Sequence, residues 1–121
     1  MLTYDAVIKG GRVLDPANKT DAVLDVGIIH GRIDAVGEDL EPSAGGRTID
    51  ASGRWVMPGH IDTHAHVAGL ARNWDPALGY AMLAEAGTTT VLDMGGTGAS
   101  LIDGIKRRGA GLNVAGQFAM I

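Results

Sequence analysis

Three of the chain's four histidines lie in one short run, and two of them are a single residue apart. His64 and His66 flank Ala65 within the stretch 56–67, which is typical of a strand apart from a break at Pro58-Gly59. Side chains two positions apart on a strand point to the same face, whereas on a helix they would diverge by roughly 200°, at about 100° per residue. Both imidazoles can therefore reach one ion from a strand, and imidazole pairs suit zinc and similar divalent cations. The spacing indicates a candidate metal site.

A bare His-X-His pair also has a plainer interpretation, namely two polar side chains where a strand meets solvent. Position favours the metal, because this strand opens a series of strands and helices, and barrels of such units form active sites at the carboxyl ends of their strands. Asp62 shares the face and is a candidate for contacting substrate or orienting a metal ligand, with pairing to a basic residue as the equal alternative. His60 is a candidate for the same roles, and packing or a local hydrogen bond explains it better.

The residues after this run predict a helix and then a second strand. Asp75 is a good N-cap, and Pro76 suits the first helical position, where its missing N–H costs nothing. Gly87 can end the helix in a left-handed conformation, and the β-branched run 88–94 predicts the strand. The apolar stripe expected on the helix consists of four residues: Leu78, Met82, Leu83 and Ala86.

The remaining residues continue the alternation. Asp93 ends the strand at 88–94 and is a candidate for contacting substrate or a metal ligand, although capping of the following turn is the favoured interpretation. The glycine-rich stretch 95–98 could bind an anion at a helix N-terminus, with plain turn chemistry favoured again. A second helix is expected up to the basic triplet 106–108, where cations suit the helix dipole, with Gly109 as its stop. An apolar strand at 112–121 completes the order strand, helix, strand, helix, strand, which predicts parallel βαβ units.

The first half of the chain, 1–55, predicts short strands of a small antiparallel sheet or part of a β-sandwich. Gly10-Gly11 separates the runs 4–9 and 12–14 and is a strong signal for a two-residue hairpin. His30-Gly31 predicts a second hairpin, since Gly31 can supply a positive φ. Residues 37–47 read as a loop, and a further short strand is expected over 47–51.

The composition of the chain argues against nucleic acids and membranes as binding partners. The formal net charge is -4, with 10 basic and 14 acidic residues, so the basic excess of a nucleic-acid surface is missing. No apolar run approaches the ~20 residues that span a bilayer, and we expect no membrane association. With no cysteine there are no disulfides or thiolate ligands, which suits a reducing compartment, and a cytoplasmic location is expected.

Four stretches together resemble the amidohydrolase superfamily. They are YDAVIKGGRVLD (4–15), VGIIHGRIDAVG (26–37), IDASGRWVMPGHIDTHAH (49–66) and AGTTTVLD (86–93). Within the family the chain is most similar to the amide-cleaving branch of D-aminoacylases, deacetylases, dihydroorotases and hydantoinases. His60 departs mildly from the pattern, which has a plain apolar residue there.

The resemblance implies a fold and a metal centre. Residues 1–55 would be the N-terminal part of a composite β-domain, a β-sandwich portion, and 56–121 the first three strands and two helices of a (β/α)₈ TIM-like barrel. His64 and His66 would bind a divalent metal, zinc above all, in a mono- or binuclear centre that activates water to cleave an amide. The family's other ligands and its proton-transferring aspartate fall outside the matching stretches. We therefore expect a truncated chain with no catalytic residue of its own, weak or absent metal binding and no activity alone.

Two other functions remain open at this point. One keeps the family but changes the reaction to deamination of a purine or pyrimidine, and the other is a stand-alone binding or assembly module without enzymatic activity. The partner expected for the parent enzyme is a small-molecule amide. A homo-oligomer is also expected, because an incomplete barrel leaves two exposed strand edges, at 112–121 and at its first strand, 56–67. The contact between copies is expected to be apolar and centred on 88–94 and 112–121.

Overall fold

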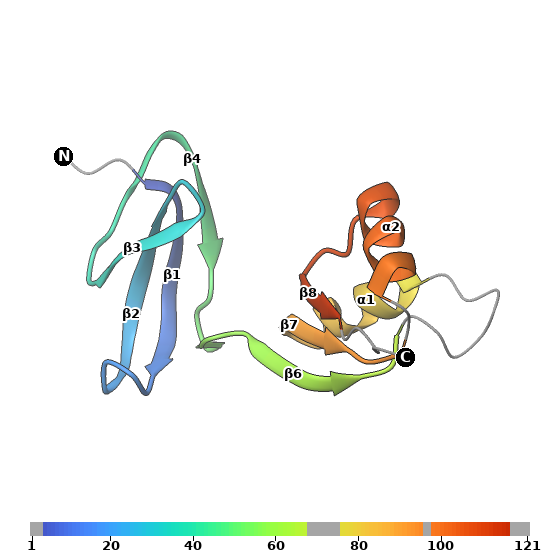
Figure 1. Ribbon diagram of the computed structural model, residues 1–121. Helices are drawn as coiled ribbons and strands as arrows, with labels where there is room; N and C mark the ends of the chain where they lie inside the picture. The colour runs from blue at the N-terminus through green and yellow to red at the C-terminus, as the bar shows by residue number, and fades with distance from the viewer. Residues whose placement is uncertain (1–3, 68–75, 96–97, 117–121) are drawn as a thin grey trace. The chain divides into compact units, whose positions relative to one another are not determined.

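The computed structural model describes residues 4–67, 76–95 and 98–116 of the chain, which forms two compact units, Met1–Pro58 and Gly59–Ile121 (Figure 1). The elements in chain order are β1 (Tyr4–Asp15), β2 (Thr20–Ile29), β3 (Arg32–Gly37), β4 (Pro42–Asp50), β5 (Trp55–Val56), β6 (His60–Ala65), α1 (Pro76–Glu85), β7 (Thr88–Asp93), α2 (Gly98–Arg108) and β8 (Asn113–Gly116). The division falls after Pro58 rather than after Trp55 because Val56 pairs with Val13 of β1.

The first unit is a five-stranded mixed sheet of order β3-β2-β1-β4, with β5 also paired to β1. The pairs β1–β2 and β2–β3 are antiparallel, but β4 and β5 run parallel to β1, so the expectation of an antiparallel sheet is wrong for these strands. The reason lies in the length of β1, whose 12 residues accommodate two partners in succession along one edge. Lys9 is the last residue opposite β4, and Arg12 is the first opposite β5.

Gly10 and Gly11 do not form the predicted hairpin, because β1 continues through them to Asp15. The register between β1 and β2 shifts between Ile8 and Gly11, as in a β-bulge, and Gly10 takes a φ of 68° that suits glycine. A side chain at Gly11 would bring its Cβ within 2.5 Å of Val56. The glycines therefore serve a bulge and a close approach to β5, not a chain reversal.

The second predicted hairpin is confirmed. His30 and Gly31 have φ values of 49° and 73° and connect β2 to β3. The expected loop at 37–47 is too long, since β4 already begins at Pro42. Its register against β1 jumps from Pro42 to Arg47, so the glycine-rich residues between them do not follow the ladder. Because glycine and serine are typical of turns, the sequence predicted a loop where the structure has the start of β4.

The second unit is a parallel sheet of order β6-β7-β8, as the alternation of strands and helices predicted. Its core forms around Tyr80 of α1, Val91 of β7 and Leu101 of α2. Gly87 and Gly109 follow the two helices with φ values of 88° and 73°, as expected. Neither helix in the described ranges is long and apolar enough to cross a membrane. The N-cap expected at Asp75 and the strand expected beyond Gly116 lie outside the described residues.

The apolar stripe predicted for α1 is confirmed at Leu83 but wrong at Leu78 and Met82. Leu78 and Met82 remain 59% and 60% exposed, whereas Tyr80 is only 1% exposed. Leu83 packs with Tyr80 in the core, so the buried face is rotated from the one that the aliphatic residues suggested. Tyr80 can be buried because its hydroxyl has an acceptor in the core, the carboxylate of Asp93.

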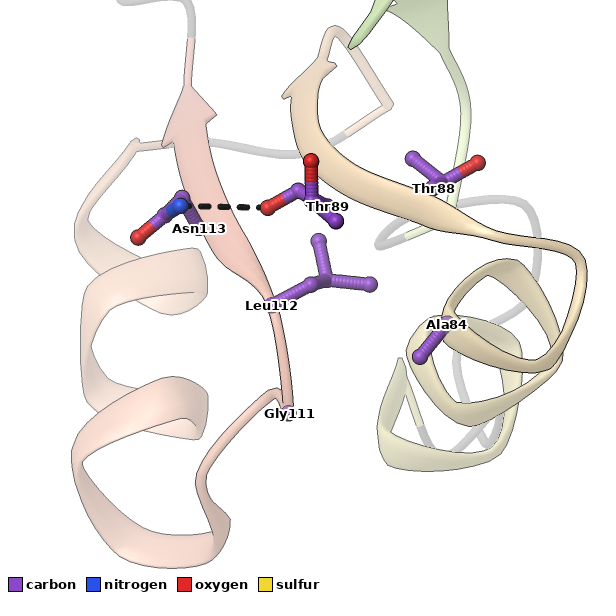
Figure 2. Close-up of a pocket in the computed structure, with 6 residues that line it drawn as sticks. All are labelled: Ala84, Thr88, Thr89, Gly111, Leu112 and Asn113. Atoms are coloured by element: carbon purple, nitrogen blue, oxygen red, sulfur yellow. Dashed lines mark hydrogen bonds between the residues drawn. The ribbon is translucent and has the colours of Figure 1, made fainter. Parts of the chain in front are cut away.

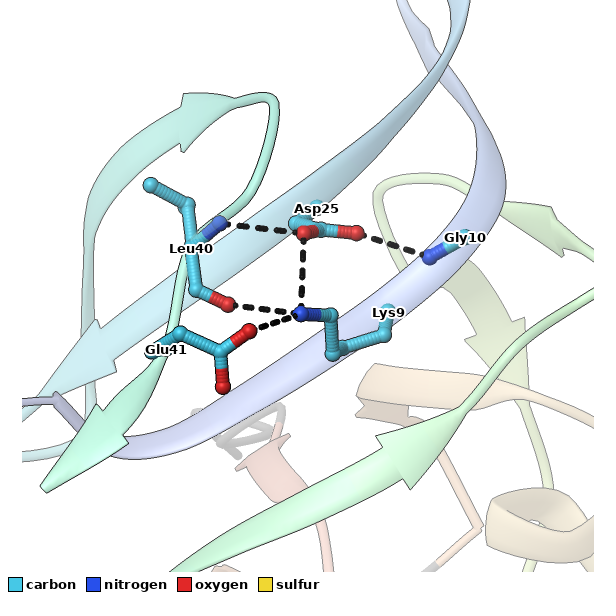
Figure 3. Close-up of polar contacts among 5 residues, drawn as sticks. All are labelled: Lys9, Gly10, Asp25, Leu40 and Glu41. Carbon is cyan, nitrogen blue, oxygen red and sulfur yellow. Dashed lines mark hydrogen bonds and ion pairs between the residues drawn. The ribbon is translucent and has the colours of Figure 1, made fainter.

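The bulge in β1 is held by a buried carboxylate (Figure 3). Asp25 of β2 accepts the N–H of Gly10 at 2.8 Å and the N–H of Leu40 at 3.1 Å. The Lys9 ammonium lies 3.7 Å from the same carboxylate and also binds Glu41 at 2.6 Å. Asp25 thus joins the irregular part of β1 to the segment that leads into β4.

We expect Asp25→Asn to destabilise the first unit by about 1–3 kcal/mol, because an amide group would turn a donor toward one of the two N–H groups and leave it unsatisfied. Urea unfolding followed by circular dichroism measures the change. Asp21→Asn is the matched control, since Asp21 pairs with Arg12 on the exposed surface and its loss should change the midpoint little. Equal midpoints for Asp25→Asn and the native chain would contradict the role of Asp25.

Candidate metal centre

The alternation of side chains along β6 places the two histidines of the predicted metal site on one side. Ala65 and Val67 pack against the core of the second unit. His64 and His66 alternate with them and are both exposed. Because neighbouring residues of an extended chain face opposite ways, burial of Ala65 and Val67 turns both imidazoles away from the core.

The two imidazoles converge on a common point. Their Nε2 atoms are 3.2 Å apart, with ring centroids separated by 5.2 Å and ring planes tilted by 41°. Two nitrogens that each bind one tetrahedral zinc at about 2.0–2.1 Å are themselves about 3.3 Å apart, so the pair fits a shared ion. The same distance also allows one ring to donate a hydrogen bond to the other in the appropriate tautomer. Among the described residues, no group of three or more histidines and carboxylates completes a metal site.

Asp62 contacts the backbone of this segment. Its Oδ1 accepts the N–H of His64 at 3.0 Å, and its side chain is half-buried. The ladder between β6 and β7 is irregular at this point, with a register shift between Asp62 and Ala65. Asp62 therefore steadies the backbone of His64 where regular pairing is interrupted, a role that neither interpretation of the sequence anticipated.

His60 lies at the opposite end of β6 from His66. Its backbone N–H donates to the carbonyl of Gly87 at 3.0 Å, and its Nδ1 is 3.4 Å from Oγ1 of Thr88. The structure gives this histidine local contacts with the start of β7. It does not bring the ring of His60 together with those of His64 and His66.

Asp93 lies on the core side of β7 and is 1% exposed. Its Oδ2 accepts the hydroxyl of Tyr80 at 2.7 Å, and its Oδ1 accepts the N–H groups of Gly95 at 2.8 Å and of Val67 at 3.2 Å. The bond to Gly95 is the turn contact that the sequence favoured. Burial, followed by the hydrogen bond to Asp93, raises the pKa of Tyr80 above its usual value, which keeps the phenol protonated as a donor.

Tyr80 is the residue that sequence reasoning missed. The available signal was an aromatic side chain with a polar end in the middle of an apolar helix, which requires a buried acceptor if the ring is to be buried. The prediction from sequence did not connect Tyr80 with Asp93, the carboxylate that accepts its hydroxyl in the structure.

The second unit also has a hollow that none of the candidate histidines lines, although Thr88 of β7, which contacts His60, does (Figure 2). It has a volume of about 580 Å³ and is lined by Ala84, Thr88, Thr89, Gly111, Leu112 and Asn113. These residues cluster at the amino ends of β7 and β8, where Asn113 donates to the carbonyl of Thr89 at 3.1 Å. His66 follows the carboxyl end of β6, so in a parallel sheet it lies at the other edge.

Comparison with known proteins gives consistent relatives, although no family model matches the chain. A dihydroorotase from Trichlorobacter lovleyi is 47% identical over 74 residues, which cover 61% of this chain and 16% of that protein. The crystal structure of an N-acyl-D-glutamate deacylase from Bordetella bronchiseptica, complexed with zinc and a phosphonate inhibitor, has a TM-score of 0.71 and 27% identity over 98% of this chain and 30% of its own. A D-aminoacylase in complex with copper chloride has a TM-score of 0.57 and 37% identity over 78% of this chain and 19% of its own.

The chain spans 16% and 22% of the length of two dihydroorotases that it matches. The sequence matches and the structural matches point to the same group of proteins. The chain belongs to the amidohydrolase superfamily and corresponds to the N-terminal region of its members.

Proposed function

We propose that this chain supplies the first two metal ligands, His64 and His66, of a metal-dependent hydrolase that cleaves linear or cyclic amide C–N bonds. The observation that carries the proposal is the convergence of the two Nε2 atoms, which lie 3.2 Å apart on exposed residues at the carboxyl end of β6. A divalent ion held there, zinc above all, would supply an activated water and polarise the amide carbonyl. The described residues themselves bind the ion and hold its ligands in place. Proton transfer to the leaving nitrogen is assigned to none of them.

The fold supports the same proposal. We infer that β6, α1, β7, α2 and β8 are the first units of a (β/α)₈ barrel, in which active sites form at the carboxyl ends of the strands. His64 and His66 lie at that end of β6, the first strand of the parallel sheet. The sheet of the first unit would belong to a composite β-domain, and the TM-score of 0.71 to the deacylase over 98% of the chain supports this arrangement.

The names of the relatives favour amides as the substrate class. The proteins compared are a dihydroorotase, an N-acyl-D-glutamate deacylase and a D-aminoacylase, and two of them were solved with zinc or copper. These names favour hydrolysis of cyclic or linear amides over deamination of a purine or pyrimidine. They also favour an enzymatic role over that of a binding module.

We expect the 121-residue chain to bind zinc weakly through the histidine pair. His64→Ala or His66→Ala removes one of two ligands and should lower the affinity at least about tenfold, which is about 1.4 kcal/mol. Isothermal titration with zinc measures the change, and dialysis against a chelator should remove the ion, because two imidazoles leave most of a four-coordinate shell to water. The matched control is His30→Asn, since His30 is an exposed histidine of the first unit with a positive φ that asparagine tolerates. Unchanged affinity in both alanine variants would refute the site.

Purified chain should not hydrolyse N-acetyl amino acids or cyclic amides above the background rate. The physical reason is the ligand count, since the described residues bring only two histidines together and offer no cluster of three. A chromatographic assay with zinc in excess tests this expectation. Turnover that disappears in His66→Ala would show instead that the chain carries a complete active site.

A further inference from the structure

We propose that Asp93 is a positioning residue for the histidine pair and that Tyr80 holds the Asp93 carboxylate in place. One oxygen of this carboxylate accepts the N–H of Val67, the residue directly after His66, and the other accepts the hydroxyl of Tyr80. A single buried group thus connects the histidine segment to β7 and to α1. The metal-binding part of the inference rests on the proposed function.

The histidine segment needs such an anchor because strand pairing ends there. Along the β6–β7 ladder, Asp62 lies opposite Val91 and Ala65 lies opposite Asp93, so an extra residue is accommodated around His64. The N–H of Met94 donates to the carbonyl of Ala65 at 2.7 Å, and β6 ends at that residue. His66 is therefore already outside the strand.

Two bonds then fix the backbone on either side of His66. Before it, the carbonyl of Ala65 is bound by Met94, and after it, the N–H of Val67 is bound by Asp93 at 3.2 Å. Without the second bond, the peptide between His66 and Val67 could rotate and carry the imidazole with it. The direction of the His66 ring depends on this carboxylate, although Asp93 and the ring lie on opposite sides of the sheet.

Tyr80 makes the anchor rigid. A buried carboxylate is costly unless hydrogen bonds satisfy it, and bonds to an ionised acceptor are stronger than neutral ones. The phenol of Tyr80 donates at 2.7 Å to Oδ2, which leaves Oδ1 for the backbone N–H groups of Val67 and Gly95. Because Tyr80 belongs to α1, the packing of this helix against the sheet positions the Asp93 carboxylate.

A purely structural role for Asp93 and Tyr80 predicts loss of stability with no effect on the histidines of the folded chain. Two nearly isosteric variants separate this alternative from the proposal. Asp93→Asn replaces one acceptor oxygen with a donor, and Tyr80→Phe removes only the hydroxyl. Asp103→Asn is the control, because Asp103 is an exposed carboxylate of the same unit that pairs with Arg107 on α2.

The test measures zinc affinity by titration and, in the metal-free chain, the amide exchange of Val67 and the ring resonances of His66 by NMR. We expect Asp93→Asn to weaken zinc binding by about tenfold or more, as loss of a group that orients a metal ligand does. Exchange at Val67 should accelerate and the His66 signals should shift. Tyr80→Phe should change the same quantities in the same direction by a smaller factor, and Asp103→Asn should change none of them.

A folded Asp93→Asn chain with native zinc affinity, native exchange at Val67 and unshifted His66 signals would overturn the proposal. If Asp93→Asn does not fold, the same three measurements on Tyr80→Phe decide the question. If the native chain binds no zinc, the proposed function fails, but the metal-free NMR comparison still confirms or overturns the positioning role.

Discussion

The second unit depends on the alternation of side chains at the carboxyl end of β6. Ala65 and Val67 complete the core beneath the two helices, and this burial leaves His64 and His66 on the other side of the chain. The hydrophobic effect that stabilises the unit therefore also brings the imidazoles together. A shift of register by one residue would bury the histidines and expose the apolar pair, so the same pattern specifies both the folding of the unit and the placement of the histidines.

The first unit shows a comparable dependence on a single irregularity. The bulge at Gly10 lets β1 follow β2 beyond it and still accept β5 on its other edge. The carboxylate of Asp25 binds the N–H of Gly10 at this point, and the residue is 6% exposed. In both units, a buried aspartate satisfies backbone groups where regular strand pairing is interrupted, which is how an irregular ladder avoids unsatisfied polar groups.

The sequence predicted the elements whose signals are local. The parallel alternation after Gly59, the hairpin at His30-Gly31 and the ends of both helices at glycine follow from residue types next to one another, and the structure confirms them. The hairpin predicted at Gly10-Gly11 is wrong because a glycine pair suits a hairpin turn and a bulge equally well. Only the pairing with the neighbouring strand distinguishes the two. Asp25, which accepts the N–H of Gly10, lies 15 residues further along the chain, so this contact cannot be predicted from the residues around the glycine pair.

The candidate site was likewise predictable only where its signal is local. The His-X-His spacing on a strand predicts that the two rings share a face, and the structure gives the distance between their nitrogens. The contacts of Asp62 with His64 and of Asp93 with Val67 were not predictable, because the availability of both backbone N–H groups depends on where the β6–β7 ladder breaks. The exposure of Leu78 and Met82, which were predicted to lie on the buried face of α1, has the same origin. Tyr80 is buried in preference to Leu78 because Asp93 offers its hydroxyl an acceptor that the helix sequence does not contain.

Because of these contacts, the relative orientation of the two imidazoles depends on the folded unit and not on the His-X-His sequence alone. In an unfolded chain, two imidazoles separated by one residue sample many relative orientations, and gathering them on one ion costs conformational entropy. In the folded unit, Asp62 binds the backbone of His64, and Asp93 binds the residue after His66, so much of that cost is met on folding. Preorganisation of this kind raises affinity without adding a ligand. Since Asp93 is itself held by Tyr80, correct docking of α1 is a condition for a well-formed histidine pair, even though no residue of that helix belongs to it.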